Sequence, residues 1–241
     1  LGIWMIVNSI ILWVHYDPAP TNLQLTIGTE TLCMVFVKGG TFALGESEEA
    51  LEGEDTFARK WLGEQMPQHQ VTLSDYYIGT KGEDLPVTNI TWHEALQFIE
   101  ALNRRTGQHF RLPTDAEWVY AARGGEEQNA FRYAGSNHLY EVAWAKGNSE
   151  GTPHSVMQKQ PNSLGIYDMC GNVMEWCYDW YASYPNSDEI NPTGPSTGEY
   201  KVAHGGAWRA SEMFCRPSIR TYDLPDKGYD YLGFRLAMDA D

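Results

Sequence analysis

Apolar side chains recur with a period of two in several stretches of the first eighty residues. Leu23–Ile27 alternates apolar and polar positions, and Cys33–Val37 is a nearly continuous apolar run that ends at a glycine pair. Thr41–Gly45 resumes this run, and Gln70–Ile78 alternates again. Alternation, and short apolar runs bounded by turn residues, are typical of β-strands. We therefore predict a strand in each of these stretches.

Two later stretches have the helical period instead. The first follows Thr91, has Glu94 at its third position and ends at Gly107. The second follows Thr114, has Glu117 at its third position and ends at another pair of glycines. A threonine followed three residues later by glutamate is the capping box that begins many helices. The apolar residues of the first stretch share one face, as a helix requires: Trp92, Ala95, Leu96, Ile99 and Leu102.

The rest of the chain carries weaker patterns. The acidic stretch Glu46–Glu64 is expected to be a surface loop with a short helix at Asp55–Leu62. From Gly124 onward, glycine, proline, asparagine and aromatic residues dominate, and no linker or repeat divides the sequence. The simplest interpretation is a single domain over residues 1–241 of the α+β class, in which two helices accompany short, irregular antiparallel strands.

The N-terminal stretch Leu1–Val14 is apolar and uncharged, and Asn8-Ser9 interrupts it. It is shorter than the roughly 20 residues that span a bilayer. It also lacks the initiator methionine and the positively charged start of an intact signal peptide. A buried strand or helix is the expected structure, and a remnant of processing is the alternative. Membrane attachment is expected only through an anchor outside this sequence.

The charge of the chain restricts its partners. Thirty-two acidic and seventeen basic residues give a formal net charge of −15. Nucleic acid and anionic membranes are bound through clustered lysine and arginine, so we expect neither as a partner. An acidic surface is compatible with calcium or a basic partner, and solubility alone also explains it. The four cysteines include no C-x-x-C pair, and Cys170 and Cys177 are expected to be buried free thiols.

The segment His204–Ala237 combines an ordered frame with an irregular filling. Its frame is Gly205, Gly206, Trp208, Cys215-Arg216, Arg220 and Gly233-Phe234-Arg235. A loop of this length inside a domain is either disordered or functional. Its tyrosines argue against disorder, because aromatic residues supply rigid contact area. We predict a ligand-binding surface formed by Arg209, Ser211, Phe214, Ser218, Thr221, Tyr222, Asp223, Asp226, Tyr229, Asp230 and Tyr231. The alternative is that these residues pack into the core.

The order of several long motifs resembles the formylglycine-generating (sulfatase-modifying) enzyme family. The motifs are Val35–Phe42, Pro67–Val71, Leu85–Trp92, Arg111–Trp118, Asn162–Met169, Gly171–Trp176 and the terminal frame. The resemblance covers residues 35–237 and implies a C-type-lectin-like fold of the formylglycine-generating enzyme type. One departure concerns the segment after the strand Tyr77-Ile78-Gly79. Relatives have a further strand and a helix there, before the Leu85-Pro86-Val87 segment, whereas only Thr80–Asp84 intervene in this sequence.

The resemblance also shows what is missing for catalysis. Formylglycine formation in the family resembles a copper-assisted oxidation that depends on a cysteine pair shortly after the Gly-Gly turn. A soft thiolate pair is suited to monovalent copper. The corresponding stretch here, Arg209–Phe214, contains no cysteine, and Cys215 matches a later cysteine that is not one of the pair. We therefore predict that the chain is not an enzyme and requires no cofactor. A formylglycine-generating-type oxidase with altered thiols is the alternative.

One subgroup matches the terminal frame especially well: the variable proteins of diversity-generating retroelements, in which mutagenesis alters codons near the C-terminus. The resemblance implies a non-enzymatic ligand-binding protein with a variable segment at residues 204–237. An unknown protein or cell-surface ligand would be the partner. The location would be the bacterial cell surface or the extracellular space, and the cytoplasm is the alternative. A calcium-dependent lectin is a further alternative, although the sugar-selecting triplets Glu-Pro-Asn and Gln-Pro-Asp are absent.

The resemblance further implies a structural calcium site in the turn before Trp176. The ligands would be the side chains of Asp168 and Glu175 and the carbonyl groups of Gly171 and Val173. Hard oxygen ligands of this kind suit calcium. A metal-free turn held by hydrogen bonds is the alternative.

Overall fold

The computed structural model describes residues 3–7, 10–14, 22–81, 85–128 and 130–240. The apolar N-terminal stretch forms an antiparallel hairpin of β1 (Ile3–Val7) and β2 (Ile10–Val14). Of the two structures expected for this stretch, strand and helix, the strand is the one present. The burial of its side chains lies outside what the structure describes. In the described ranges no helix is both long enough and apolar enough to cross a bilayer.

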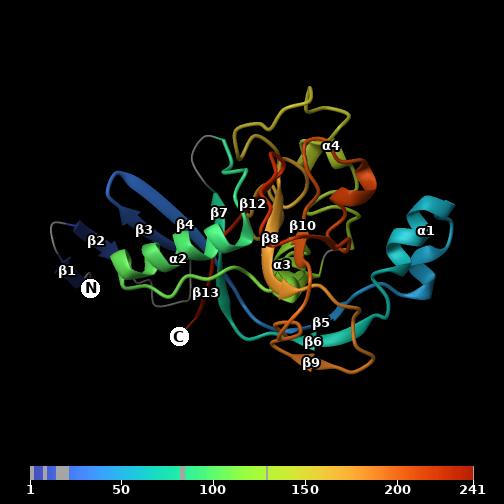
Figure 1. Cartoon of the computed structure of the whole chain (residues 1–241), viewed down its shortest axis with the longest axis horizontal. Helices are drawn as coiled ribbons and strands as arrows, with labels where there is room; N and C mark the ends of the chain where they lie inside the picture. Colours follow the sequence, from blue (N-terminus) through green and yellow to red (C-terminus); the bar gives the residue numbers. More distant parts are fainter. Residues whose placement is uncertain (1–2, 8–9, 15–21, 82–84, 129, 241) are drawn as a thin grey trace.

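An antiparallel sheet joins the beginning of the chain to its end (Figure 1). Its strands, in spatial order, are β13 (Ala237–Asp239), β7 (Tyr76–Lys81), β4 (Glu30–Val37) and β3 (Leu23–Ile27). The predictions for Leu23–Ile27 and Cys33–Val37 are confirmed, and the second strand begins three residues earlier than expected. Because β13 pairs with β7, the end of the terminal segment is fixed to the body of the protein.

A second sheet carries most of the terminal segment. Its order is β11 (Thr221–Asp223), β10 (Lys201–His204), β8 (Met174–Trp180) and β12 (Leu232–Phe234). The other pairs of this sheet are antiparallel as expected, whereas β12 runs parallel to β8. Since β10 is antiparallel to both β8 and β11, β11 and β12 run in the same direction on opposite edges. The connection 224–231 must therefore return across the sheet, as crossovers between parallel strands do.

A third sheet consists of β5 (Thr41–Leu44), β6 (His69–Thr72) and β9 (Glu189–Ile190), and β9 is also parallel to its neighbour β6. The single strand predicted over Gln70–Ile78 is wrong: it is two strands in different sheets. Between them the backbone N–H of Leu73 donates to Gly40 O at 2.9 Å. That of Ser74 donates to Asn191 Oδ1 at 2.7 Å. These partners lie outside the ladder and bend the chain.

Both predicted capping boxes are present. Thr91 caps α2 (Trp92–Thr106), which ends at Gly107 with φ +70°, and Thr114 caps α3 (Asp115–Ala122). The short helix expected near Asp55 is α1 (Thr56–Gly63), with Asp55 Oδ1 accepting from the Ala58 N–H at 2.8 Å. The four-residue helix α4 (Leu139–Val142) was not predicted, because so short a stretch shows no periodicity. Short 3₁₀ turns cover Glu48–Leu51, Gly125–Glu127 and Glu212–Cys215.

Two main clusters of buried side chains hold these layers together. Every residue of α3 is buried, and the helix lies behind β8 and β10 (Figure 1). Helix α2 buries Trp92 and Ile99 against Leu25 and Met34 of the first sheet. Tyr229 and Tyr231 of the terminal segment are partly buried and pack against the same cluster as α2. The terminal segment is thus attached to a scaffold formed by both sheets.

Candidate functional site

The terminal segment begins at a turn that accepts only glycine. Gly206 has φ +67°, and a Cβ at this position would lie 2.7 Å from Phe214 O. Near the other end of the segment, a Cβ on Gly233 would lie 2.2 Å from Val87 O. Both distances are far below ordinary contact, and the positive φ of Gly206 also favours glycine. The glycines at the two ends of the frame therefore fix how the segment leaves and rejoins the scaffold.

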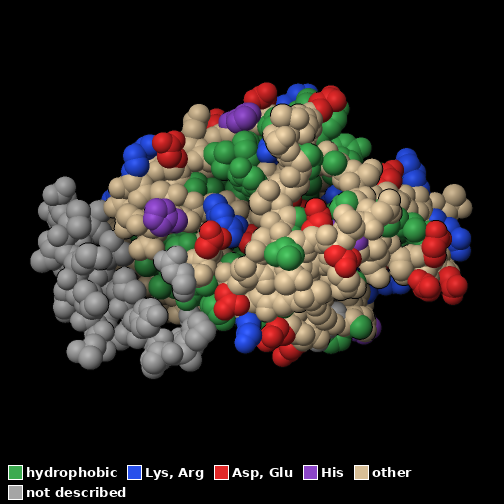
Figure 2. All heavy atoms as spheres, turned by 90° about the horizontal axis from the view of Figure 1, so that it is seen from below, with side chains coloured by type: hydrophobic (Ala, Val, Ile, Leu, Met, Phe, Trp, Pro, Cys, Tyr) green, Lys and Arg blue, Asp and Glu red, His purple; other side chains and the backbone are tan. Residues whose placement is uncertain are grey.

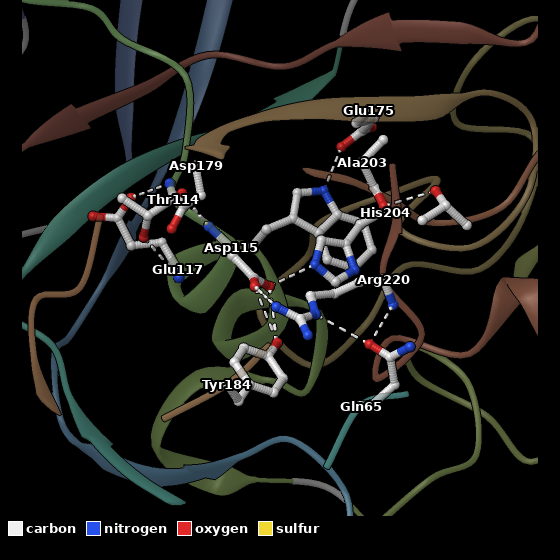
Figure 3. A network of polar contacts seen from close by, with 12 residues as sticks. Gln65, Thr114, Asp115, Glu117, Glu175, Asp179, Tyr184, Ala203, His204 and Arg220 are labelled. Atoms are coloured by element: carbon white, nitrogen blue, oxygen red, sulfur yellow. Dashed lines mark hydrogen bonds and ion pairs between the residues drawn. The ribbon is translucent and has the colours of Figure 1, made fainter. Parts of the chain in front are cut away.

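A buried polar network holds the start of this segment (Figure 3). Asp115, the first residue of α3, accepts from three sides: His204 Nε2 lies 2.7 Å from its Oδ1, while Tyr184 Oη and Arg220 Nη1 lie 3.0 and 3.4 Å from its Oδ2. Burial opposes ionisation of Asp115, but hydrogen bonding and charge from His204, with the charge of Arg220, lower its pKa. This carboxylate thereby ties the end of β10 and the residue before β11 to one helix.

A second carboxylate, Asp179, lies beside Asp115 and has the opposite character. Burial, and then the negative charge of Asp115, raise the pKa of Asp179 well above its ordinary value. Its Oδ2 accepts from the backbone N–H of Asp115 at 2.9 Å. The pKa values of these two neighbouring buried carboxyl groups are thus shifted in opposite directions, that of Asp115 down and that of Asp179 up.

The closing residues of the frame attach to the same centre. The ring of Trp118 stacks on His204 at 4.7 Å between centroids, and its Nε1 donates to Glu175 Oε2 at 2.6 Å. Arg235 donates to both oxygens of Glu175, at 2.6 and 2.5 Å. This two-point pair is the geometry that guanidinium and carboxylate favour.

Five of the predicted ligand-binding residues converge on one surface, which we call the recognition face: Arg209, Asp223, Tyr229, Asp230 and Tyr231. Arg209 Cζ lies 4.1 Å from the ring centre of Tyr231, and Arg209 Nη1 lies 3.5 Å from Asp230 Oδ1. The rings of Tyr229 and Tyr231 stack at 5.0 Å. The hydroxyl of Tyr229 donates to Asp223 Oδ1 at 2.7 Å, and this bond with burial raises the pKa of Tyr229 to about 12.

The backbone beneath this face is held in place by hydrogen bonds to other elements. Tyr229 O accepts from the Asn89 N–H at 2.8 Å, and Tyr231 O accepts from the Met174 N–H at 2.8 Å. Pro225 O accepts from the first N–H of α2, at Trp92, at 3.1 Å. The loop 224–231 is therefore anchored to α2 and β8, and its irregular backbone is an ordered one.

Three other predicted residues lie nearby in different settings. Thr221 Oγ1 donates to Ala203 O at 2.9 Å, so its hydroxyl is used inside the sheet. Tyr222 follows on β11 and therefore points to the opposite side from Thr221 and Asp223. There its ring lies 4.2 Å from that of Tyr181. Asp226 is exposed and lies 3.3 Å from His93 Nε2.

The remaining predicted residues do not belong to this face. The ring of Phe214 lies 4.9 Å from that of Trp61 and 6.1 Å from that of Phe57, so it packs against α1. Ser218 lines a separate cavity together with arginine side chains. Ser211 is exposed before the 3₁₀ turn that leads to Phe214. The ligand-binding role of the whole predicted set stays a prediction.

The turn proposed for calcium fits a cation at only one of its two carboxylates. Asp168 Oδ2 accepts from the Met157 N–H at 2.8 Å, while its buried Oδ1 has no partner among the described residues. Glu175 does not fit, because Arg235 already neutralises it and both its oxygens are engaged. Within the described ranges, no three His, Cys, Asp or Glu side chains are grouped so that they could hold a metal ion. Calcium at this turn stays a prediction.

The cysteines are free, and three of the four are buried: Cys170, Cys177 and Cys215. Burial raises the pKa of Cys215 to about 12, and it also raises the pKa of Cys170 and of Cys177. The thiolate is the form that binds metals and attacks electrophiles, and these side chains strongly disfavour it. The expectation of buried free thiols at Cys170 and Cys177 is confirmed.

Two structural features had no signal in the sequence. The network centred on Asp115 joins residues up to 105 positions apart, Asp115 and Arg220, which no local pattern reveals. Lys201 is buried, and its Nζ lies 3.9 Å from the ring centres of both Trp92 and Trp180. Burial lowers the pKa of Lys201 to about 8.

Comparison with known proteins places this fold. The sulfatase-modifying factor enzyme 1-like domain matches residues 79–240, and the chain belongs to this family. The fold is the C-type-lectin-like fold of the formylglycine-generating enzyme type. The family match begins later than the residue 35 expected from the motifs.

Its relatives differ in what their names say they do. The chain is similar to the chaperone protein LppX of Paenibacillus barcinonensis, with 28% identity over 86% of this chain and 89% of that protein. It is 34% identical to the formylglycine-generating enzyme of Streptomyces coelicolor over 65% of this chain, but spans only 53% of that enzyme. Among solved structures, variable protein 1 of Treponema denticola superposes with a TM-score of 0.80 at 25% identity, covering 92% of this chain and all of that one. The resemblance to both groups, inferred from the motifs, is confirmed.

Proposed function

We propose that this chain is a non-enzymatic binding protein whose recognition face is built on the terminal segment 204–237. The observation that carries the proposal is the convergence of Arg209, Tyr229, Asp230 and Tyr231 on a backbone fixed by the surrounding scaffold. A surface of this kind loses little conformational freedom when it binds, which favours affinity. The superposition on a Treponema denticola variable protein supports the same interpretation.

The composition of the face suits protein recognition. Tyrosine and arginine are the residues most often found at the energetic centres of protein interfaces. Arg209 and Asp230 are both exposed, so they are available to a partner's charged groups. Together with the net charge of −15, Asp223 and Asp230 favour a partner that presents lysine or arginine. We therefore propose an unidentified protein or other cell-surface ligand, met at the bacterial surface or outside the cell.

The properties of the thiols argue against the alternative of formylglycine-type oxidation. The segment Arg209–Phe214 has no cysteine, and the nearest thiol, Cys215, is buried with a pKa raised to about 12. Copper(I) bound by sulfur requires thiolates or thioethers that can reach it. Met213 is the neighbouring thioether, and it too is buried. These groups do not form an accessible soft-ligand pair.

The two functions are separated by a copper titration coupled to a peptide assay. The purified chain and the Streptomyces coelicolor enzyme would be titrated with Cu(I) against a competing chelator and given a cysteine-containing sulfatase peptide. We expect the enzyme to bind copper and convert the peptide, and this chain to do neither. Tight Cu(I) binding with peptide oxidation by this chain would overturn the proposal.

Diversification of the face is a separate part of the proposal and has its own test. Sequencing the genomic locus should reveal a near-copy of the DNA that encodes the last forty or so residues, beside a reverse transcriptase gene. The copy should differ from the gene in the codons of the recognition face and match it in those of the frame. A locus without such a copy would refute diversification and leave a face of fixed sequence.

A further inference from the structure

A cavity that is separate from the recognition face is lined by several positively charged side chains, although the protein as a whole is acidic. It has a volume of about 440 Å³ and is lined by Arg123, Arg132 and Arg216, together with Glu46, Phe131 and Ser218. Charged side chains of both signs are scattered over the face shown in Figure 2. Three of the chain's seventeen basic residues thus line one cavity, in a protein whose net charge is −15. We call this cavity the arginine pocket.

Two of these arginines already converge on one oxygen atom. Arg216 Nη1 lies 2.8 Å from Oε1 of Glu54, and Arg132 Nη2 lies 3.3 Å from the same oxygen. Glu54 precedes α1 and does not itself line the pocket, but both arginines that it pairs with do. With Glu46 it brings two negative charges against three positive ones, so the pocket keeps a surplus of one positive charge. The two guanidinium groups thus already have the arrangement that clamps an oxyanion.

Arg216 carries a further donor that the protein leaves unused. Its side chain is only 12% exposed, and its Nε is buried without a hydrogen-bond partner among the described residues. A buried N–H group without an acceptor costs free energy, so this placement of Arg216 is not the best one for stability alone. Structural ion pairing accounts for Nη1 of this residue but not for its Nε.

The stability of the fold does not explain the cluster. The side chain of Arg132 is 53% exposed, and exposed ion pairs stabilise proteins little. Arg123 is held in place by a different contact, a hydrogen bond that its Nη1 donates to Ala43 O at 2.9 Å. Burial lowers the pKa of Arg123, although the charge of Glu46 opposes that shift, so the charged form of Arg123 is held at a cost. A bound anion would offset that cost.

We propose that the arginine pocket binds a small organic molecule through a phosphate or carboxylate group. The guanidinium fork matches both anions, and the volume lies within the range of small-molecule sites. Phe131 is 45% exposed at the wall and would contact the apolar body of such a ligand, while the Ser218 hydroxyl would serve its anionic end. Glu54 occupies the clamp as an internal competitor.

Isothermal titration at low salt with phenyl phosphate and with benzoate tests this, and phenol is the neutral control. We expect saturable one-to-one binding of at least one of the two anions and none of phenol. Arg132→Ala should weaken binding by about tenfold or more, since a charge-assisted bond to an oxyanion is lost. Arg104→Ala is the control, because Arg104 is likewise an exposed arginine, at 65%, but lies on α2 and does not line the pocket. It should bind the probes as the unmodified protein does.

Two further variants separate the clamp from general charge. Arg216→Lys keeps the charge but loses the planar guanidinium fork, so it should also weaken binding. Glu54→Gln removes the internal competitor and should strengthen binding several-fold. Thermal unfolding of each variant verifies that it is folded. The proposal is overturned if neither anion binds at millimolar concentration, if Arg132→Ala binds like Arg104→Ala, or if Glu54→Gln binds more weakly. None of these results would bear on the recognition face.

Discussion

The side chains of His204 and Asp115 meet at 2.7 Å in the interior, although 89 positions separate them in the chain. His204 ends β10 and precedes the glycine turn of the terminal segment, whereas Asp115 begins α3. The contact therefore fixes where the segment starts. Arg220, near its middle, reaches the same carboxylate. An anchor of this kind lets exposed residues change without a change in the backbone that carries them.

Replacing Asp115 by Asn should destabilise the protein strongly. The change leaves Arg220 as a buried charge without its partner, which typically costs about 3–5 kcal/mol. Asp226→Asn is the control, since that side chain is 83% exposed and its loss should change the free energy of unfolding by about 0.5 kcal/mol or less. Urea unfolding measures both. Equal stability of the two variants would show that the network is not an anchor.

The pH dependence of this difference follows from the lowered pKa of Asp115. A carboxyl group whose pKa is lower in the folded state stabilises the protein above its unfolded-state pKa, near the ordinary 3.8. That contribution is lost as the pH falls through the folded-state value. The gap between the unmodified protein and Asp115→Asn should therefore narrow at strongly acidic pH, and a constant gap would contradict the assignment of charge.

Replacing Asp179 by Asn should have the opposite effect and make the folded protein more stable at neutral pH. The pKa of Asp179 is raised in the folded state, so the ionised form is disfavoured there and stability falls as the pH rises above about the ordinary value of 3.8. Asparagine imitates the neutral form and can still accept from the Asp115 N–H. The variant should melt above the unmodified protein at neutral pH, with the difference shrinking toward pH 4. A variant that melts lower at every pH would refute this interpretation.

Lys201 should titrate as an unusually acidic lysine. Its pKa is lowered to about 8 by burial, so its protonated form is disfavoured in the folded state, and stability from this group should rise between about pH 8 and 10.5. Heteronuclear NMR of the lysine side chains should show one resonance with a midpoint near 8, which Lys201→Met removes. A spectrum in which every lysine titrates above 9.5 would exclude the effect of burial.

Native thiol labelling should separate Cys33 from the other cysteines. Cys33 is partly exposed, whereas Cys170, Cys177 and Cys215 are buried, and burial raises the pKa of these three thiols. A thiol reagent should therefore modify no cysteine other than Cys33 in the folded protein, and all four after denaturation. Rapid modification of Cys215 in the folded protein would instead reopen the oxidase hypothesis.

The frame and the recognition face should tolerate mutation very differently. Gly233→Ala places a Cβ 2.2 Å from Val87 O, a backbone atom that cannot move aside, so we expect a loss of about 3 kcal/mol or more. Arg209→Ala removes an exposed side chain and should cost about 0.5–1 kcal/mol. Urea denaturation of the two variants measures the contrast. Similar losses would mean that the face is part of the fold.

Local patterns in the sequence were sufficient for the elements whose cause is local. Thr91 and Thr114 cap their helices as predicted, because a capping box involves only residues three positions apart. The break of the predicted strand at Leu73–Asp75 was missed, since its cause is a bond to Asn191 more than a hundred residues away. The parallel direction of β12 likewise depends on the crossover of the loop 224–231 and leaves no periodicity.

Local patterns were limited in the same way when they were used to predict the site, because they do not reveal contacts between distant residues. Composition indicated that the filling of the terminal segment would form a surface, and five of its residues do converge. It did not separate Phe214, which packs on Trp61, or Ser218, which lines the arginine pocket. Those assignments depend on α1 and on the segment around Arg132, neither of which is close to the terminal segment in the sequence.

The most direct test of the central claim is a pair of displayed libraries. One randomises Arg209, Tyr229, Asp230 and Tyr231, and the other randomises Gln97, Glu100, Arg104 and Arg105 on the exposed side of α2. Each is sorted first for folding, by resistance to protease, and then for binding to lysozyme as a basic probe protein. The recognition-face library should stay mostly folded and yield binders more often than the α2 library. A recognition-face library that mostly unfolds, or yields binders no more often, would contradict the claim that this segment is a recognition surface.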